Sequence, residues 1–147
     1  MITRRTTLLA LIAAIASPAL ADNPTIYKNG NNVAVHGYDV VSYFTESTHR
    51  QGEPQFSSDY MGAVWHFSTA ANRNAFDANP EAYAPQYGGH CAYAASKGAL
   101  ASSVPEAWTV VDGKLYLNYS LGVRDLWRQD TAGNIALADG FWPELSR

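Results

Sequence analysis

The chain has 147 residues, of which 47% are hydrophobic and 16% charged, a composition typical of a globular protein rather than a disordered one. Lysine and arginine number 10 against 13 aspartate and glutamate residues, and the resulting net charge of −3 argues against a nucleic-acid partner. The single cysteine excludes an intramolecular disulfide and any zinc site built from two or more thiolates.

Residues 1–21 have the pattern of a secretory signal peptide. Arg4 and Arg5 form a positive start, an apolar run follows, and Ala19-Leu20-Ala21 is a small-residue cleavage site. The arginine pair also resembles a twin-arginine signal, and both export routes lead to the bacterial periplasm or the outside of the cell. The apolar run is shorter than the roughly 20 residues that span a bilayer. We therefore expect the mature chain, residues 22–147, to be one exported domain without a membrane span.

The first half of the mature chain predicts strands. Val33-Ala34-Val35 predicts a short strand, and the apolar run 37–44 fits a helix or a strand equally well. Residues 54–60 and 63–68 contain aromatic and β-branched side chains and flank Met61-Gly62, so they predict a hairpin.

Two helices are predicted to follow this hairpin. The first covers residues 70–78, is capped by Thr69 or the serine before it, and is stopped by Asn79-Pro80. The second begins at Gly89 or His90 and ends at Ser96.

The second half of the chain predicts another hairpin and further helices. Residues 108–111 and 114–118 flank Asp112-Gly113, which supplies the positive φ angles of a type I′ turn. Ser120 can cap the next helix, and a helical apolar stripe continues from Ile135 until Pro143. Together these patterns predict an α+β fold in which a small antiparallel sheet of β-hairpins packs against several short helices.

Several motifs occur in order along the mature chain. They are Gly37-Tyr38-Asp39-Val40-Val41-Ser42-Tyr43-Phe44, Trp65-His66-Phe67-Ser68, Asn79-Pro80 with Tyr83, Pro85-Gln86-Tyr87-Gly88-Gly89-His90-Cys91-Ala92-Tyr93, and Asp112-Gly113-Lys114-Leu115-Tyr116-Leu117-Asn118. This set resembles an exported protein of the YHS-domain family. The resemblance implies a metal-associated setting, because relatives occur in metal-transporting ATPases and multicomponent oxygenases. Cysteine-rich relatives carry a cysteine after the aromatic strand, where this chain has Ser68, so a multi-cysteine metal site does not carry over.

Cys91 is the principal candidate for a metal ligand. The glycines at 88 and 89 allow positive φ angles and a close approach by a backbone or a ligand. In the first turn of the predicted helix, unpaired N–H groups would favour a Cys91 thiolate. A thiolate beside the His90 imidazole suits a soft metal such as copper, with His66 or His36 as further ligands if folding brings them close. The alternative is that Cys91 is a small buried hydrophobic residue that packs the helix against the sheet.

The other histidines differ in their expected surroundings. His66 lies between Trp65 and Phe67 on a predicted strand, so its side chain should face away from both. His36 lies in a predicted turn, and His49 lies in a polar stretch that predicts an exposed loop.

Tyrosines around the double glycine are candidates for a ligand pocket. Tyr83, Tyr87 and Tyr93 lie near Gly88 and Gly89 in the sequence and could line such a pocket. The alternative is that these tyrosines belong to the hydrophobic core, since each aromatic side chain buries roughly 150–250 Å².

These observations favour a non-enzymatic periplasmic binding module for copper or another soft metal. The alternative is a domain that binds a periplasmic protein partner or a small apolar ligand, with Cys91 purely structural. A third hypothesis is a redox enzyme that uses Cys91 and needs an external resolving thiol. A hydrolase dyad of His90 and Cys91 is disfavoured, because adjacent helical residues project about 100° apart.

Overall fold

The computed structural model describes residues 25–147, so the expected signal peptide lies outside the described residues. In that range, no helix has the length and apolar character needed to cross a membrane. In chain order, the elements are the 3-10 turn η1 (Val35–Gly37), α1 (Ser42–Thr45), β1 (Glu53–Tyr60), β2 (Ala63–Phe67), α2 (Ala70–Ala78), α3 (Pro80–Tyr83), the 3-10 turn η2 (Gln86–Gly89), α4 (Ala92–Ser96), β3 (Val104–Val111), β4 (Lys114–Asn118), α5 (Leu121–Arg128) and α6 (Thr131–Leu145).

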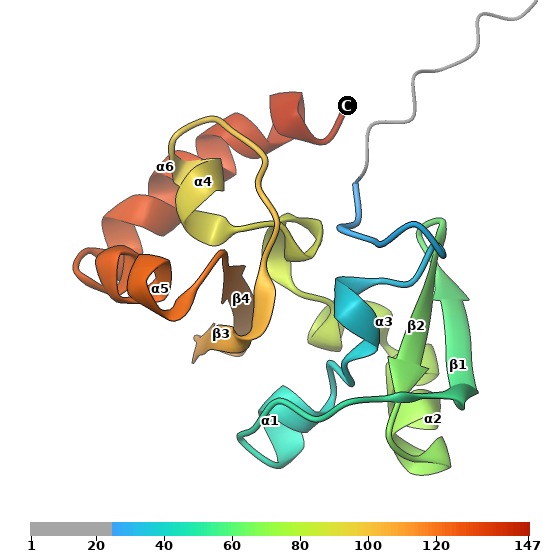
Figure 1. Cartoon of the computed structure of the whole chain (residues 1–147). Helices are drawn as coiled ribbons and strands as arrows, with labels where there is room; N and C mark the ends of the chain where they lie inside the picture. Colours follow the sequence, from blue (N-terminus) through green and yellow to red (C-terminus); the bar gives the residue numbers. More distant parts are fainter. Residues whose placement is uncertain (1–24) are drawn as a thin grey trace, which may run out of the picture.

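The strands form two antiparallel hairpins, β1–β2 and β3–β4 (Figure 1). Both turns contain two consecutive residues with positive φ, +49° and +73° at Met61-Gly62 and +51° and +73° at Asp112-Gly113. These are the angles that a type I′ turn requires, and they match the right-handed twist of the flanking strands. The predicted α+β class is confirmed, with two small sheets in place of one.

Side-chain caps determine where the longer helices begin. Thr69 accepts a hydrogen bond from a backbone N–H in the first turn of α2, and Ser120 does the same for α5. The carboxylate of Asp130 caps α6. The predicted helix over residues 70–78 and the predicted cap at Ser120 are confirmed.

Three local predictions are corrected. Pro80 begins α3 instead of only ending α2, because proline suits the first position of a helix. Pro143 lies inside α6, two residues before its last residue, so the hydrogen bond that its missing N–H cannot make belongs to the final turn. Val33 and Ala34 form isolated bridges rather than a strand, because the backbone becomes left-handed at Val35, the first residue of η1, with a φ of +41°.

The two hairpins and their helices bury two hydrophobic clusters. Figure 1 shows β1 and β2 with α2 and α3 on one side of the molecule, and β3 and β4 with α4, α5 and α6 on the other. Strand β4 serves both clusters, because Leu115 and Leu117 belong to the first and the intervening Tyr116 to the second. This division follows from the alternation of side chains along a strand. The turn η2 lies at the junction, since its Tyr87 belongs to the second cluster and its Gly89 lies against Val35 of the first.

Strand β2 shows the same alternation. Trp65 and Phe67 are almost fully buried in the first cluster, whereas His66 between them is partly exposed. The prediction that His66 faces away from its aromatic neighbours is confirmed.

Candidate functional site

Two left-handed turns, η1 and η2, meet in the region of the double glycine. Three consecutive residues of each turn have positive φ, from +41° at Val35 to +73° at Gly37 and from +56° at Tyr87 to +82° at Gly89. Such angles are uncommon for residues other than glycine and are strained for a β-branched residue such as Val35. Strained backbone persists only where its surroundings hold it in place, and it concentrates at functional sites.

The segment 25–27 binds both turns. The N–H of Tyr27 donates to the carbonyl of Gly88 at 2.8 Å, and the carbonyl of Tyr27 accepts from the N–H of Val35 at 3.0 Å. A β-carbon on Gly88 would collide with the carbonyl of Thr25, and one on Gly89 would collide with the side chain of Val35. The double glycine therefore allows the chain's own backbone and core side chains to approach closely.

A cavity of about 330 Å³, open to solvent, lies beside η2. Tyr60 from β1, Tyr87 from η2 and Trp142 from α6 give it aromatic walls, and Glu81 contributes a carboxylate. Of the predicted pocket residues, Tyr87 and Gly88 line this cavity. Sequence reasoning missed Tyr60 and Trp142, because they come from elements far from the double glycine along the chain.

The ring of Tyr87 is held rigidly at the cavity wall. Its hydroxyl donates to Oδ1 of Asp139 at 2.9 Å, and its ring centroid lies 5.7 Å from that of Trp142 and 5.9 Å from that of Tyr116. Burial raises the pKa of Tyr87 well above its ordinary value, and the hydrogen bond to Asp139 raises it further. The phenol is therefore a neutral hydrogen-bond donor under physiological conditions.

The remaining predicted pocket residues lie elsewhere. The ring of Tyr83 packs edge-on against Phe44, with ring centroids 5.6 Å apart. The ring of Tyr93 carries the Lys97 ammonium 4.9 Å from its centroid. Gly89 packs against core side chains, as described above. These residues support the fold around the cavity without lining it.

Cys91 occupies the N-cap position of α4 and is 1% exposed. Its Sγ accepts hydrogen bonds from the N–H groups of Ala94 at 3.5 Å and Tyr119 at 3.3 Å, and the thiol donates to Oδ1 of Asn118 at 3.5 Å. The expected position of Cys91 within the first helical turn is corrected. Because His90 has an extended backbone and Cys91 is not helical, α4 begins at Ala92, two or three residues after the predicted start.

Asn118 connects the thiol to the sheet. It is the last residue of β4 and is fully buried, and its Oδ1 also accepts a hydrogen bond of 3.0 Å from the N–H of Tyr93. Cys91 and Asn118 thus join the end of β4 to the start of α4. This arrangement matches the alternative in which Cys91 packs the helix against the sheet.

The predicted histidine ligands are distributed over the same region. The rings of His36 and His90 both pack against Tyr27, with centroid distances of 5.3 Å and 5.6 Å. Nε2 of His36 is 2.8 Å from the carbonyl oxygen of Ser103. The ring of His66 lies against Gly37. The structure therefore brings His36 and His90 to one aromatic ring and places His66 at η1.

A metal centre was the first expectation for these residues. Among residues 25–147, no group of three or more histidine, cysteine, aspartate or glutamate side chains is arranged to hold a metal ion. The site formed by Cys91 with His90, His66 and His36 stays a prediction.

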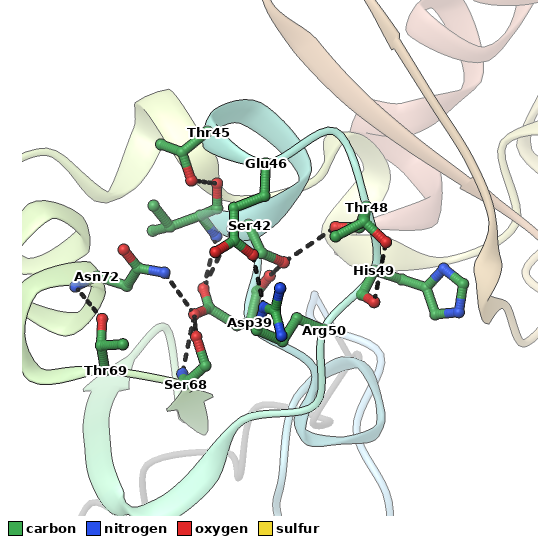
Figure 2. Close-up of polar contacts among 11 residues, drawn as sticks. Asp39, Ser42, Thr45, Glu46, Thr48, His49, Arg50, Ser68, Thr69 and Asn72 are labelled. Carbon is green, nitrogen blue, oxygen red and sulfur yellow. Dashed lines mark hydrogen bonds and ion pairs between the residues drawn. The ribbon is translucent and has the colours of Figure 1, made fainter.

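A second concentration of polar groups surrounds Asp39 (Figure 2). This carboxylate is fully buried, and its Oδ1 accepts from the N–H groups of Val41 at 2.9 Å and Ser42 at 3.3 Å. Its Oδ2 accepts from the N–H and the hydroxyl of Ser68 and from Nδ2 of Asn72, at 2.7 to 2.8 Å. Through Oδ1, Asp39 caps the turn that leads into α1. The carboxylate also ties the start of α1 to the junction between β2 and α2.

Residues 41–87 match the YHS domain family. The matched segment runs from the start of α1 through both strands of the first hairpin to Tyr87 in η2. Cys91 and His90 lie just beyond it. No curated protein and no solved structure matches the chain.

Proposed function

We propose that this YHS-domain protein is an exported, non-enzymatic binding module that holds a small aromatic or apolar ligand in the cavity beside Tyr87. The observation that carries the proposal is the set of three aromatic walls, Tyr60, Tyr87 and Trp142, around a cavity of about 330 Å³. Sites for small molecules have volumes of roughly 300–1,000 Å³ and are lined mainly by apolar and aromatic groups.

Rigid walls support this proposal. Tyr87 is fixed by its hydrogen bond to Asp139 and by contact with Trp142, so the cavity exists before a ligand arrives. A preformed site avoids the entropic cost of ordering side chains on binding. The carboxylate of Glu81 provides a polar group that can orient a ligand carrying a hydrogen-bond donor.

Cys91 serves the fold in this proposal. Its sulfur has three hydrogen-bonding partners that join β4 to α4, and its side chain is buried. The cavity does not include Cys91 among its described lining residues. Ligand binding should therefore be independent of the thiol.

Export is part of the same proposal. Its support is the signal-peptide pattern of residues 1–21, with a cleavage site at Ala19-Leu20-Ala21. Fractionation of cells that express the full chain should recover the protein in the periplasm or the medium, shortened by cleavage near Ala21. Recovery of the uncleaved chain in the cytoplasm would contradict export.

Indole is a suitable probe for the cavity. We expect indole to shift the NMR signals of residues that line the cavity, Tyr60 and Trp142 among them. Ala84→Trp should abolish binding, because Ala84 lines the cavity and a larger side chain would fill it. Ala82→Trp is the matched control, since Ala82 is exposed and lies outside the lining. Undiminished indole binding by the Ala84 variant would overturn the proposal.

A second candidate function is the binding of a soft metal, copper foremost, by Cys91 with His90, His66 or His36. The family match favours it, because the resemblance to YHS-domain proteins implies a metal-associated setting. This candidate predicts that metal is retained through purification in a reducing buffer and lost in Cys91→Ser. Absence of stoichiometric metal binding would exclude it.

A further inference from the structure

A second cavity, an open surface groove of about 470 Å³, lies between the β3–β4 turn and one exposed face of α6. Ala132, Ile135 and Ala136 supply an apolar lining from the helix. These residues lie one helical turn apart or are adjacent, and the two alanines leave space above the helix surface. The cavity has the size of a small-molecule site.

Two carboxylates border this apolar lining. Asp112 comes from the turn between β3 and β4, and Asp139 comes from α6. Neither forms an ion pair with a lysine, arginine or histidine within residues 25–147. The cavity therefore combines apolar walls with two negative charges that lack a cationic partner in this part of the chain.

The two carboxylates act on one buried phenol. Burial raises the pKa of Tyr116, and the charges of Asp139 and Asp112 raise it further. Both carboxylates belong to the lining of the same cavity. Asp139 is also oriented by the hydroxyl of Tyr87, which donates to its Oδ1 at 2.9 Å. This hydrogen bond holds the carboxylate in position before a ligand arrives.

We propose that this cavity binds a small organic cation, a primary alkylammonium whose head pairs with Asp112 and Asp139 and whose stem lies on Ala132, Ile135 and Ala136. The ammonium would form charge-assisted hydrogen bonds, and the stem would bury apolar surface. A small ligand fits better than a protein partner. Stable protein interfaces bury about 800 Å² on each side, which is more surface than a groove lined by so few residues offers. The site differs in position and ligand from the cavity beside Tyr87, so each can fail without the other.

Hexylamine is the probe that tests this proposal. At neutral pH it carries an ammonium on an apolar stem, and 1-hexanol has the same stem without the charge. We expect calorimetry with the purified chain to show that hexylamine binds at least about tenfold more tightly than 1-hexanol. We also expect the backbone NMR signals of Ala132 and Ala136 to shift, and affinity to fall as salt is added.

Conservative variants locate the binding charge. Asp112→Asn keeps the turn, because asparagine tolerates positive φ there, and Asp139→Asn keeps an acceptor for the Tyr87 hydroxyl. Each should weaken hexylamine binding by roughly tenfold, the effect of one lost charge-assisted contact. Asp59→Asn is the matched control, since it removes the same charge from an exposed position on β1 and should leave affinity unchanged.

Three results would overturn the proposal. Equal binding of 1-hexanol and hexylamine would show an apolar groove without a role for charge. Equal loss in all three aspartate variants would show attraction to net charge alone. Tighter binding of a trilysine peptide than of hexylamine would assign the surface to a basic protein segment.

Discussion

The hydroxyl of Ser68 donates a hydrogen bond of 2.7 Å to Oδ2 of Asp39, a carboxylate without solvent exposure. Ser68 stands where the cysteine-rich relatives that this chain resembles carry a cysteine. Ser68 thus completes a buried polar joint in this protein. The joint holds α1 against the start of α2 and so fixes one end of the segment that matches the YHS domain.

Removing the Asp39 carboxylate should destabilise the fold strongly. We expect Asp39→Ala to lower the free energy of unfolding by roughly 3 kcal/mol or more, because several buried N–H groups would lose their acceptor at about 1–3 kcal/mol each. Urea unfolding followed by tryptophan fluorescence measures this loss. Asp77→Ala is the control, since Asp77 is exposed and accepts one hydrogen bond from Ser58. A loss no larger than the control's would contradict the role given to Asp39.

The contact between Gly89 and Val35 makes a second prediction about stability. Gly89→Ala should destabilise by roughly 2–4 kcal/mol, because a β-carbon would collide with the Val35 side chain at a φ of +82°. Gly113→Ala has a similar φ of +73° in open space and should cost only about 1 kcal/mol. Adding Val35→Ala to Gly89→Ala should cost less than the separate effects combined. Additive losses in urea unfolding would show that the two residues do not compete for space.

Local chemistry made much of the fold predictable. The Asp112-Gly113 turn and the Ser120 cap each depend on a few adjacent residues, so the sequence pattern was enough to place them. The left-handed turn at Val35 was not predictable in this way. A β-branched residue adopts that backbone only because surrounding groups hold it, and those groups come from distant parts of the chain.

The candidate sites were harder to predict from the sequence than the fold was. Ser68 and Asn72 form hydrogen bonds with Asp39, from which they are separated by 29 and 33 positions in the sequence. Asn118 forms a hydrogen bond with Cys91, which lies 27 positions before it. No local pattern specifies such pairings. The sequence correctly predicted that Gly88 allows another group to approach the chain closely. The structure shows that this group is the backbone of Thr25.

Buried tyrosines should make the protein sensitive to alkali. Burial raises the pKa of Tyr43 and Tyr87 well above the ordinary value of 10.0. The stabilising effect of these two tyrosines is complete below pH 10. Above pH 10 their phenols ionise in the unfolded chain but stay protonated in the folded protein. The free energy of unfolding therefore falls as the pH rises. We expect a loss of up to about 1.4 kcal/mol per pH unit for each tyrosine.

Variants can assign this alkaline loss to particular tyrosines. Tyr43→Phe removes one buried phenol, together with its hydrogen bond to the Pro105 carbonyl, and should make the dependence of unfolding free energy on pH shallower above pH 10. Tyr119→Phe changes an exposed side chain and should leave the slope as in the unmodified chain. Urea unfolding between pH 8 and about pH 11 compares them. Identical slopes in both variants would exclude Tyr43 as a source of the effect.

The Cys91 thiol should be unreactive toward thiol reagents in the folded protein. Because the side chain is 1% exposed and its sulfur is engaged with Asn118 and two N–H groups, Ellman's reagent should leave it unmodified until urea unfolds the chain. Cys91→Ala should lower stability by roughly 1–2 kcal/mol while indole binding persists, because the sulfur supports the joint between β4 and α4 rather than the cavity. A thiol that reacts rapidly in the native state and is protected by Cu(I) would reverse this assignment and favour the metal-binding candidate.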